Sequence, residues 1–295
     1  MKLEEGVLTL HQSDISHYMK CPEQFRVVNG LHPGAVWEPV DGGRIETDAA
    51  TVGTVLHAVI EEDLNTRFVR VRDAIKFGMD YFHQLLGEYL ESGVEYRTES
   101  FGADPSKPMA QIKFLIENWF RSDERRYWMS RNPDGYETEW SFDIPFVTFD
   151  NPNVIREVRL AGQADVLDLD GNRILDWKSA SRAYQRWEKQ RWEVQPTVYT
   201  YAGVHENKIK LNKGGFAQFD YRVFVRGQNN DCQELTVWRG NGQWGWLVTL
   251  VDNIVKVMES DAEMWPLRDD HALCGPKWCP VWSSCKGLFV DEEWR

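Results

Sequence analysis

A hairpin signal near the middle of the chain constrains the fold most. The apolar stretch VLDL at 166–169 is followed by Asp170-Gly171-Asn172 and then by the stretch RILDW at 173–177. Asp-Gly between two such stretches is typical of a tight turn, because both residues tolerate the backbone angles that the turn requires. We therefore expect two antiparallel strands here, with Asp165 on the approach to the first of them.

The apolar spacing changes along the chain from helical to alternating. It predicts helices at 13–28, 52–69, 71–91, 108–131, within 182–205 and at 243–261. It predicts further strands at 137–148, 154–161, 216–226 and 233–238. This order favours one α/β domain over residues 1–295, with a mainly helical part at 1–135, a sheet core at 136–265 and a Cys-rich segment at 266–295.

Composition excludes several classes of protein. With 42% hydrophobic and 27% charged residues the chain is globular, and no apolar run is long enough to span a membrane. The first residues lack the apolar run of a signal peptide, so we expect a cytoplasmic protein. The 34 Lys and Arg against 46 Asp and Glu give a net charge of −12, so any contact with nucleic acid must use local basic patches.

Two carboxylates and a lysine are expected to meet on the hairpin. Asp176 and Lys178 are two apart on the returning strand, so they share a face, and the turn can bring Asp165 beside them. Such carboxylates can bind Mg²⁺ or Mn²⁺, which polarises a phosphodiester and makes a bound water more acidic. The lysine can orient that water or offset charge at phosphorus. The alternative is a surface hairpin with a salt bridge.

Three further residues can join this group. His57 lies on the predicted helix at 52–69, with Glu61 one turn later, and its imidazole can be another metal ligand. Gln195 and Tyr199 are four apart, so they share one side of a helix and can bind a phosphate or the lysine. Taken singly, His57 and Tyr199 are equally typical of packed core residues. Pro196 predicts a kink or a helix start.

In this order the motifs resemble those of the RecB-type nucleases of the PD-(D/E)XK superfamily. The matching motifs are G-x-x-x-H at 53–57, G-x-x-D at 162–165, D-x-K at 176–178 and Q-x-x-x-Y at 195–199. Ala164 stands where the superfamily name has Pro, as is usual for RecB-like members. The resemblance covers about residues 9–290 and implies a restriction-endonuclease-like α/β core with a mixed sheet.

The resemblance also implies a role for each site residue. It assigns His57, Asp165 and Asp176 as ligands of the catalytic Mg²⁺ or Mn²⁺, and Lys178 as the catalytic lysine. It assigns Gln195 and Tyr199 to the support of the site.

The cysteines indicate a second metal centre. Cys274, Cys279 and Cys285 lie close together in the sequence near the C-terminus, and a fourth ligand must come from elsewhere. Cys21, in a Cys-Pro pair, is the candidate, whereas Cys232 reads as an ordinary thiol. Four cysteines can bind either a [4Fe–4S] cluster or Zn²⁺.

The cysteine pattern resembles the iron–sulfur branch of the same family, the AddB-like and CRISPR-associated RecB-like exonucleases, including stand-alone phage-type copies. These have one Cys in an N-terminal helix and three near the C-terminus, usually spaced C-x₂-C-x₅-C. Here the second gap is kept and the first is x₄. The resemblance favours the cluster, which would clip the two ends of the chain together.

A basic stretch follows the D-x-K strand. Arg182, Arg186 and Lys189 fall near one helical face, with Tyr184 and Trp187 between them. Basic and aromatic side chains beside a hydrolytic site suit single-stranded DNA. The alternative is a solvated helix face.

The sequence therefore predicts a metal-dependent deoxyribonuclease, an exonuclease on single-stranded DNA or DNA ends with a structural cluster. The alternatives are a structure-dependent endonuclease, or a silent DNA-binding or adaptor subunit with a zinc or iron–sulfur clip. The expected partner is DNA and not a membrane. The resemblance also allows a homo-oligomer, partners of the recombination or CRISPR type, and a role in DNA repair.

Overall fold

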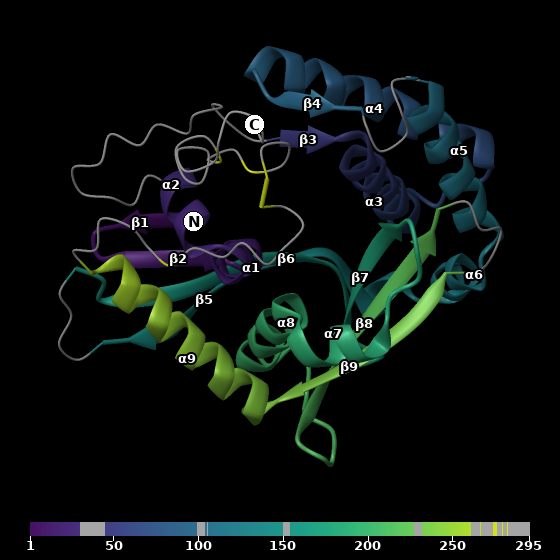
Figure 1. The fold of residues 1–295 in the computed structure, drawn as a ribbon. Helices are drawn as coiled ribbons and strands as arrows, with labels where there is room; N and C mark the ends of the chain where they lie inside the picture. The colour runs from purple at the N-terminus through teal and green to yellow at the C-terminus, as the bar shows by residue number, and fades with distance from the viewer. Residues whose placement is uncertain are drawn as a thin grey trace. The chain divides into compact units, whose positions relative to one another are not determined.

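The computed structural model describes most of the chain. The described residues are 1–29, 45–98, 104, 106–149, 154–226, 232–260, 266, 274–275, 279 and 282. They form two compact units, each built from separate stretches of chain (Figure 1). Unit 1 comprises Met1–Gly43, Phe142–Gly162 and Gly242–Arg295, and unit 2 comprises Arg44–Ser141 and Gln163–Asn241. Strands β5 (Tyr136–Thr148) and β6 (Glu157–Asp168) contribute residues to both units.

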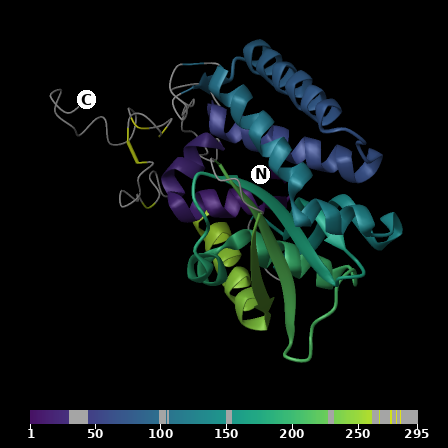
Figure 2. The same cartoon turned by 90° about the vertical axis from the view of Figure 1, so that its right-hand side faces the viewer.

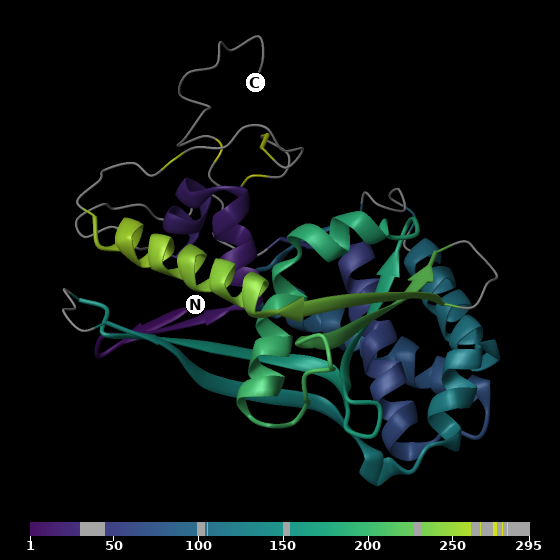
Figure 3. The ribbon, with the colours of Figure 1, turned by 90° about the horizontal axis from the view of Figure 1, so that it is seen from below.

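In unit 1, short strands lead into two consecutive helices. Its further elements are β1 (Lys2–Glu4), β2 (Val7–His11), α1 (Gln12–Lys20), α2 (Pro22–Val28) and α9 (Asn241–Met258). The strand order is β1-β2-β6, with β1 antiparallel to β2 and β2 parallel to β6, and β5 pairs with β6. Helix α9 lies over these strands (Figure 3) and buries Leu247, Val251 and Ile254. The apolar spacing did not predict β1 and β2, which are too short to show a period.

The helix predicted at 13–28 is two helices, because the chain breaks at Cys21. This residue has an extended backbone, with φ −155° and ψ 104°, and it caps both α1 and α2. Pro22 then occupies the first position of α2, where a helix needs no N–H donor. The Cys-Pro pair therefore ends one helix and begins the next.

Unit 2 contains a mixed sheet and most of the helices. Its elements are β3 (Ile45–Thr47), α3 (Asp48–Thr66), α4 (Val71–Ser92), β4 (Glu95–Arg97), α5 (Ser106–Arg121), α6 (Asp123–Ser130), a 3₁₀ turn (Pro133–Gly135), β7 (Arg173–Ala180), α7 (Arg186–Trp192), α8 (Val194–His205), β8 (Phe216–Val225) and β9 (Gln233–Gly240). The strand order is β6-β7-β8-β9, and only the β7–β8 pair is parallel. Strands β3 and β4 form a separate parallel pair. The predicted α/β class with a mixed sheet is confirmed.

Helices cover both faces of β7. Its successive side chains point to opposite faces, so each face packs against different helices. Trp177 faces α5 and α6, where its ring centroid lies 5.5 Å from that of Trp119 and 6.2 Å from that of Trp128. Helices α3, α4 and α5 lie side by side (Figure 2). On the opposite face α8 comes close at Gly203, where an added Cβ would lie 3.0 Å from Ile174 Cδ1. The sheet of unit 2 is therefore a central layer between helices.

Two long predicted helices are each divided in the structure. The helix predicted at 108–131 breaks at Ser122, whose Oγ accepts a hydrogen bond from Arg125 N at 3.1 Å and caps α6. The helix predicted within 182–205 becomes α7 and α8, which are separated at Glu193. No helix in the described ranges is both long enough and apolar enough to span a membrane.

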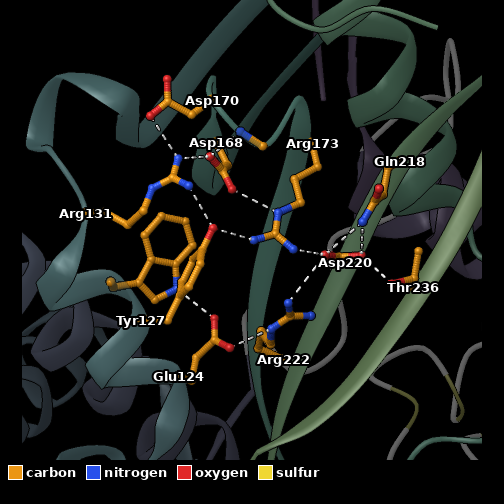
Figure 4. Close-up of polar contacts among 12 residues, drawn as sticks. Glu124, Tyr127, Arg131, Asp168, Asp170, Arg173, Gln218, Asp220, Arg222 and Thr236 are labelled. Carbon is orange, nitrogen blue, oxygen red and sulfur yellow. Dashed lines mark hydrogen bonds and ion pairs between the residues drawn. The ribbon is translucent and has the colours of Figure 1, made fainter. Parts of the chain in front are cut away.

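A cluster of charged side chains surrounds the β6–β7 turn (Figure 4). The fully buried Asp168 accepts hydrogen bonds from Arg173 Nε at 2.9 Å, from Arg131 Nη2 at 2.9 Å and from Gly171 N at 2.8 Å. Arg173 Nη1 also donates to Asp220 Oδ2 at 2.8 Å and so ties β7 to β8. A Cβ at Gly171 would lie 2.1 Å from Asp168 Oδ2, so the turn requires glycine there. The cluster holds the hairpin in one register.

Candidate active site

Two neighbouring strands carry the predicted carboxylates and lysine. Asp165 lies within β6, because the strand predicted at 154–161 begins at Glu157 and runs on to Asp168. Asp176 and Lys178 lie in β7, the antiparallel neighbour of β6. The Trp177 N–H donates a hydrogen bond to Asp165 Oδ2 at 2.6 Å and ties this carboxylate to β7.

Asp176 is held from two sides. Lys178 Nζ lies 2.6 Å from Asp176 Oδ2 in an ion pair that lacks hydrogen-bond geometry, and Gln195 Nε2 donates to Oδ1 at 2.6 Å. Burial raises the pKa of Asp176 in spite of the lysine. For Lys178, burial lowers the pKa, but Asp176 and Asp165 outweigh burial and raise it. The lysine is therefore a fixed positive charge beside the two carboxylates.

His57 reaches the same group from α3. Its Nδ1 lies 3.3 Å from Asp165 Oδ2. Burial alone would lower the pKa of His57, but Asp165 outweighs burial and raises it. The glycine of G-x-x-x-H has a steric role, since a Cβ at Gly53 would lie 3.2 Å from Ser179 Oγ on β7. A small residue there lets the helix approach the strand.

The Q-x-x-x-Y motif begins α8. Its Pro196 stands in the first helical turn, where a missing N–H breaks no helical hydrogen bond, so the predicted helix start is confirmed. The Tyr199 hydroxyl donates to the Gln163 carbonyl at 2.8 Å, and burial raises the pKa of Tyr199 to about 12. Tyr199 thus binds the β6 backbone two residues before Asp165.

Of the predicted site residues, His57, Asp165 and Lys178 line a pocket of about 420 Å³ within unit 2. Its walls include His57, Glu61, Tyr81, Glu139, Asp165 and Lys178. Burial raises the pKa of Glu61, and neighbouring Glu62 and Asp165 add to this effect. Burial also raises the pKa of Glu139 to about 7, again with help from Asp165 and Glu61. The described walls of the pocket therefore bring three carboxyl groups, those of Glu61, Glu139 and Asp165, together with Lys178.

Sequence reasoning missed Glu139. It noted Glu61 only for its place one helical turn after His57. No motif contains Glu139, and its position in the alternating stretch at 137–148 places it with ordinary surface residues. Only the packing of β5 in unit 2 brings it into the pocket.

The residues of the site suit a hard divalent cation in their chemistry. His57 offers an imidazole nitrogen, Asp165 and Asp176 offer carboxylate oxygens, and the buried Asp176 Oδ2 makes no hydrogen bond. The carboxylate oxygens are ligands that Mg²⁺ and Mn²⁺ accept. Among the described residues, however, no three His, Cys, Asp or Glu side chains converge closely enough to hold a metal ion. In this arrangement the donors bind one another, Lys178 and Gln195.

In unit 1, one residue contacts two of the predicted cluster cysteines, the first through its backbone and the second through its side chain. Gln24 N donates to Cys21 Sγ at 3.5 Å, and Gln24 Nε2 donates to Cys279 Sγ at 3.6 Å. The described cysteines form no disulfide. Cys285 lies outside the described residues. Cys232, which belongs to unit 2, packs against the hydrophobic core as an ordinary thiol would.

The basic stretch after β7 presents a mixed surface. Arg182 and Arg186 are exposed and have no ion pair among the described residues, and the Trp187 side chain is 62% exposed. Lys189 is instead held internally, by an ion pair with Glu193 and by the Tyr184 ring, whose centroid lies 4.2 Å from its Nζ. Of the three predicted cations, only the two arginines are free to bind a ligand.

The stretch is also fixed firmly to β9. Gln233 accepts a hydrogen bond from Tyr184 N at 2.8 Å and donates one to Tyr184 O at 3.0 Å. Gln190 makes the same reciprocal pair with the Trp238 backbone, at 3.2 Å in both directions. Two glutamines therefore hold α7 and the turn before it in place.

Solved structures that are similar to this chain match it over most of the length of both chains. One is a crystal structure of a candidate exonuclease from Eubacterium rectale, with 12% identity and a TM-score of 0.49 over 94% of this chain and 96% of that one. Another is SSO0001, with 10% identity and a TM-score of 0.35 over 92% and 96%. No curated protein matches the sequence.

The family comparison covers most of the chain. The model of the PD-(D/E)XK nuclease superfamily matches residues 9–286, which include every motif residue described above. Nucleases of this superfamily generally use Mg²⁺ or Mn²⁺. The chain belongs to the PD-(D/E)XK nuclease superfamily.

Proposed function

We propose that this nuclease is a divalent-metal-dependent DNA exonuclease that acts on single-stranded DNA or on DNA ends. One observation carries the proposal. Asp165, Asp176 and Lys178 meet at the β6–β7 hairpin, and each contacts another residue of the predicted set, since Asp165 meets His57 and Asp176 meets Gln195. A surface hairpin with one salt bridge would need neither the histidine nor the glutamine.

In this proposal His57, Asp165 and Asp176 hold a Mg²⁺ or Mn²⁺ ion. The bound ion would polarise the scissile phosphodiester and make a water more acidic. Lys178 lies on the same strand face as Asp176, so its charge can offset the negative charge that develops at phosphorus. Gln195 fixes the orientation of Asp176 by donating to Oδ1, which leaves Oδ2 directed at the lysine.

Tyr199 acts on the site indirectly. Its hydroxyl holds the Gln163 carbonyl, so it positions the stretch of β6 that carries Asp165. Gln195 and Tyr199 thus support one carboxylate each, Gln195 that of Asp176 and Tyr199 that of Asp165. Neither residue needs to touch the DNA to serve this role.

The surface formed by Arg182, Arg186 and Trp187 is the proposed DNA contact. It follows directly after β7 and is held rigidly by Gln190 and Gln233. Two unpaired guanidinium groups can bind phosphates, and an exposed indole can stack on an unpaired base. Aromatic stacking needs unpaired bases, which supports single-stranded DNA over duplex.

We further propose that Cys21, Cys274, Cys279 and Cys285 hold a [4Fe–4S] cluster, with Zn²⁺ as the alternative. The support is the approach of Cys21 and Cys279 to the same glutamine, although 257 intervening positions separate them in the chain. A shared centre would clip the two ends of unit 1.

The test is digestion of linear and circular DNA, single- and double-stranded, labelled at either end, with Mg²⁺, Mn²⁺ or EDTA. We expect metal-dependent release of nucleotides from linear single strands and no cutting of circles. Asp176→Asn and Lys178→Ala should abolish cleavage. Lys208→Ala is the matched control, because Lys208 also pairs with a carboxylate, that of Glu137 at 2.7 Å, but neither residue lines the pocket.

Two results would contradict the proposal. Equal cutting of circles and linear strands would make the protein an endonuclease. Failure of the folded protein to cleave any substrate with either metal would make it a non-catalytic DNA-binding subunit.

A further inference from the structure

Glu139 has an unusual backbone conformation for its position. Its φ is +50°, in the left-handed region that residues with a side chain rarely adopt. The other described non-glycine residues with positive φ are Glu5, Arg67, Asn172 and Asn207, which lie in turns or at helix ends. Among these residues, Glu139 alone lies inside a strand, between Thr138 and Trp140 of β5.

Two side chains hold this conformation through the Glu139 carbonyl. Ser141 Oγ donates to it at 3.3 Å, and Gln163 Nε2 donates to it at 3.4 Å. The carbonyl of the same Gln163 accepts the Tyr199 hydroxyl. A chain of hydrogen bonds therefore runs from Tyr199 of the Q-x-x-x-Y motif through Gln163 to the backbone of Glu139.

The left-handed backbone of Glu139 gives its carboxylate no hydrogen bond or ion pair that would stabilise the described part of the fold. The carboxylate is half-buried in the pocket beside His57, Asp165 and Lys178, and it makes no hydrogen bond or ion pair with any described residue. Burial and the nearby carboxylates raise its pKa to about 7, so this environment disfavours its charged form. A strained backbone at a residue whose carboxyl group lies unpaired in a pocket is typical of functional positions.

We propose that Glu139 is a further catalytic residue of the proposed nuclease, whose carboxylate accepts the proton of the attacking water. The water oxygen forms a bond to phosphorus, and its proton passes to the Glu139 carboxylate. The bond from phosphorus to the leaving sugar oxygen breaks with its electron pair, and that oxygen takes a proton from solvent. No oxidant or further reactant is needed.

This role is consistent with the other groups of the pocket. Lys178 Nζ lies 2.6 Å from Asp176 Oδ2, so the lysine is already engaged by a carboxylate. Asp165 and Asp176 are each engaged by a donor, through Trp177 N and Gln195 Nε2. Among the carboxylates that line the pocket, Glu139 is the one that has both a strained backbone and no hydrogen-bond or ion-pair partner among the described residues. The inference rests on the proposed function.

The test separates strain from chemistry by using glycine, which adopts positive φ without a steric penalty. Glu139→Gly should leave the Tm unchanged or raise it by about 2 °C, while the cleavage rate falls about 100-fold. Glu139→Gln, which keeps the size of the side chain, should reduce the rate to a similar extent. The Kd for single-stranded DNA, measured with EDTA, should stay within about twofold of wild type in both variants.

Glu5→Gly is the matched control. Glu5 has nearly the same backbone, with φ +48°, but it lies in the β1–β2 turn and does not line this pocket. Its replacement should have the same small effect on the Tm and no effect on cleavage. A loss of activity restricted to position 139 therefore reports the carboxylate and not the relief of strain.

Three outcomes would overturn the inference. The first is a wild-type rate in folded Glu139→Gly, and the second is a fall in its Tm, which would make the side chain structural. The third is the absence of any cleavage by the wild-type protein. If wild type cleaves, Asp176→Asn is inactive and Glu139→Gly is fully active, then only the role of Glu139 is wrong and the proposed function stands.

Discussion

Gln195 Nε2 donates a hydrogen bond to Asp176 Oδ1 at 2.6 Å, which joins the first turn of α8 to the centre of β7. The carboxylate is almost fully buried, with 3% of the residue exposed, and Gln195 is the hydrogen-bond donor to Oδ1 while Lys178 forms an ion pair with Oδ2. Hydrogen bonds to charged groups contribute more than neutral ones. We therefore propose that Gln195 positions Asp176, the proposed metal ligand.

Gln195→Ala should lower the free energy of unfolding by about 1.5–3 kcal/mol, since it leaves one oxygen of Asp176 unsatisfied. We expect cleavage to fall at least tenfold as Asp176 loses its fixed orientation. Urea unfolding and initial rates check both effects. Gln84→Ala, in which an exposed glutamine loses its contact with Glu88, should change neither. Wild-type rates in Gln195→Ala would remove its positioning role.

The charged cluster at the β6–β7 turn should depend on its buried member (Figure 4). Asp168→Asn removes the negative charge between Arg131 and Arg173, and breaking a buried ion pair from one side costs about 3–5 kcal/mol. Asp170→Asn affects the same Arg131, but Asp170 is 60% exposed, so its loss should cost less than about 1 kcal/mol. Chemical denaturation measures both. Equal costs for the two variants would show that burial does not determine the contribution.

We expect stacking and charge at the proposed DNA surface to affect different quantities, the affinity for DNA and its dependence on salt. Trp187→Ala should weaken binding of single-stranded DNA by about 1–3 kcal/mol without changing the salt dependence. Arg182→Ala and Arg186→Ala should each reduce the slope of log K against log salt by about 0.7. Titrations at several salt concentrations, with catalysis blocked by Asp176→Asn, measure these quantities.

Two variants serve as controls for this surface. Lys189→Ala should leave the slope unchanged, because Glu193 already neutralises Lys189. Phe216→Ala removes another exposed aromatic side chain, one that does not belong to the surface, and should leave the affinity unchanged. Loss of affinity in Phe216→Ala equal to that in Trp187→Ala would argue against a specific stacking site.

The proposed cluster predicts a coloured protein. Purification without oxygen should yield a brown protein with about four iron atoms per chain. Cys21→Ser should lose the iron and lower the Tm, because metal ligation contributes directly to folding. Cys232→Ser should keep both. A colourless protein with one zinc would replace the cluster by a zinc clip, and full iron content in Cys21→Ser would exclude Cys21 as a ligand.

The sequence alone determined the local parts of this site. Turn residues at 170–172 predicted the β6–β7 hairpin, and the two-residue period of a strand placed Asp176 and Lys178 on one face. The four-residue spacing placed Gln195 and Tyr199 on one side of α8, and Pro196 predicted a kink or a helix start, of which the structure has the helix start. Each of these follows from backbone geometry over a few residues, so no tertiary contact is needed to infer it.

Only the tertiary structure decided which distant residues meet. Gln24 lies between Cys21 and Cys279, Asp168 lies between Arg131 and Arg173, and Glu139 enters the pocket of His57 and Asp165. The contacts of Gln24 with Cys279, of Asp168 with Arg131, and of Glu139 with its pocket have no period or motif, because they join segments far apart in the chain. The strain at Glu139 is likewise invisible in the sequence, since a glutamate in an alternating stretch reads as an ordinary strand residue. In the folded chain the left-handed backbone of Glu139 is accompanied by hydrogen bonds to its carbonyl from Ser141 and from Gln163 of β6.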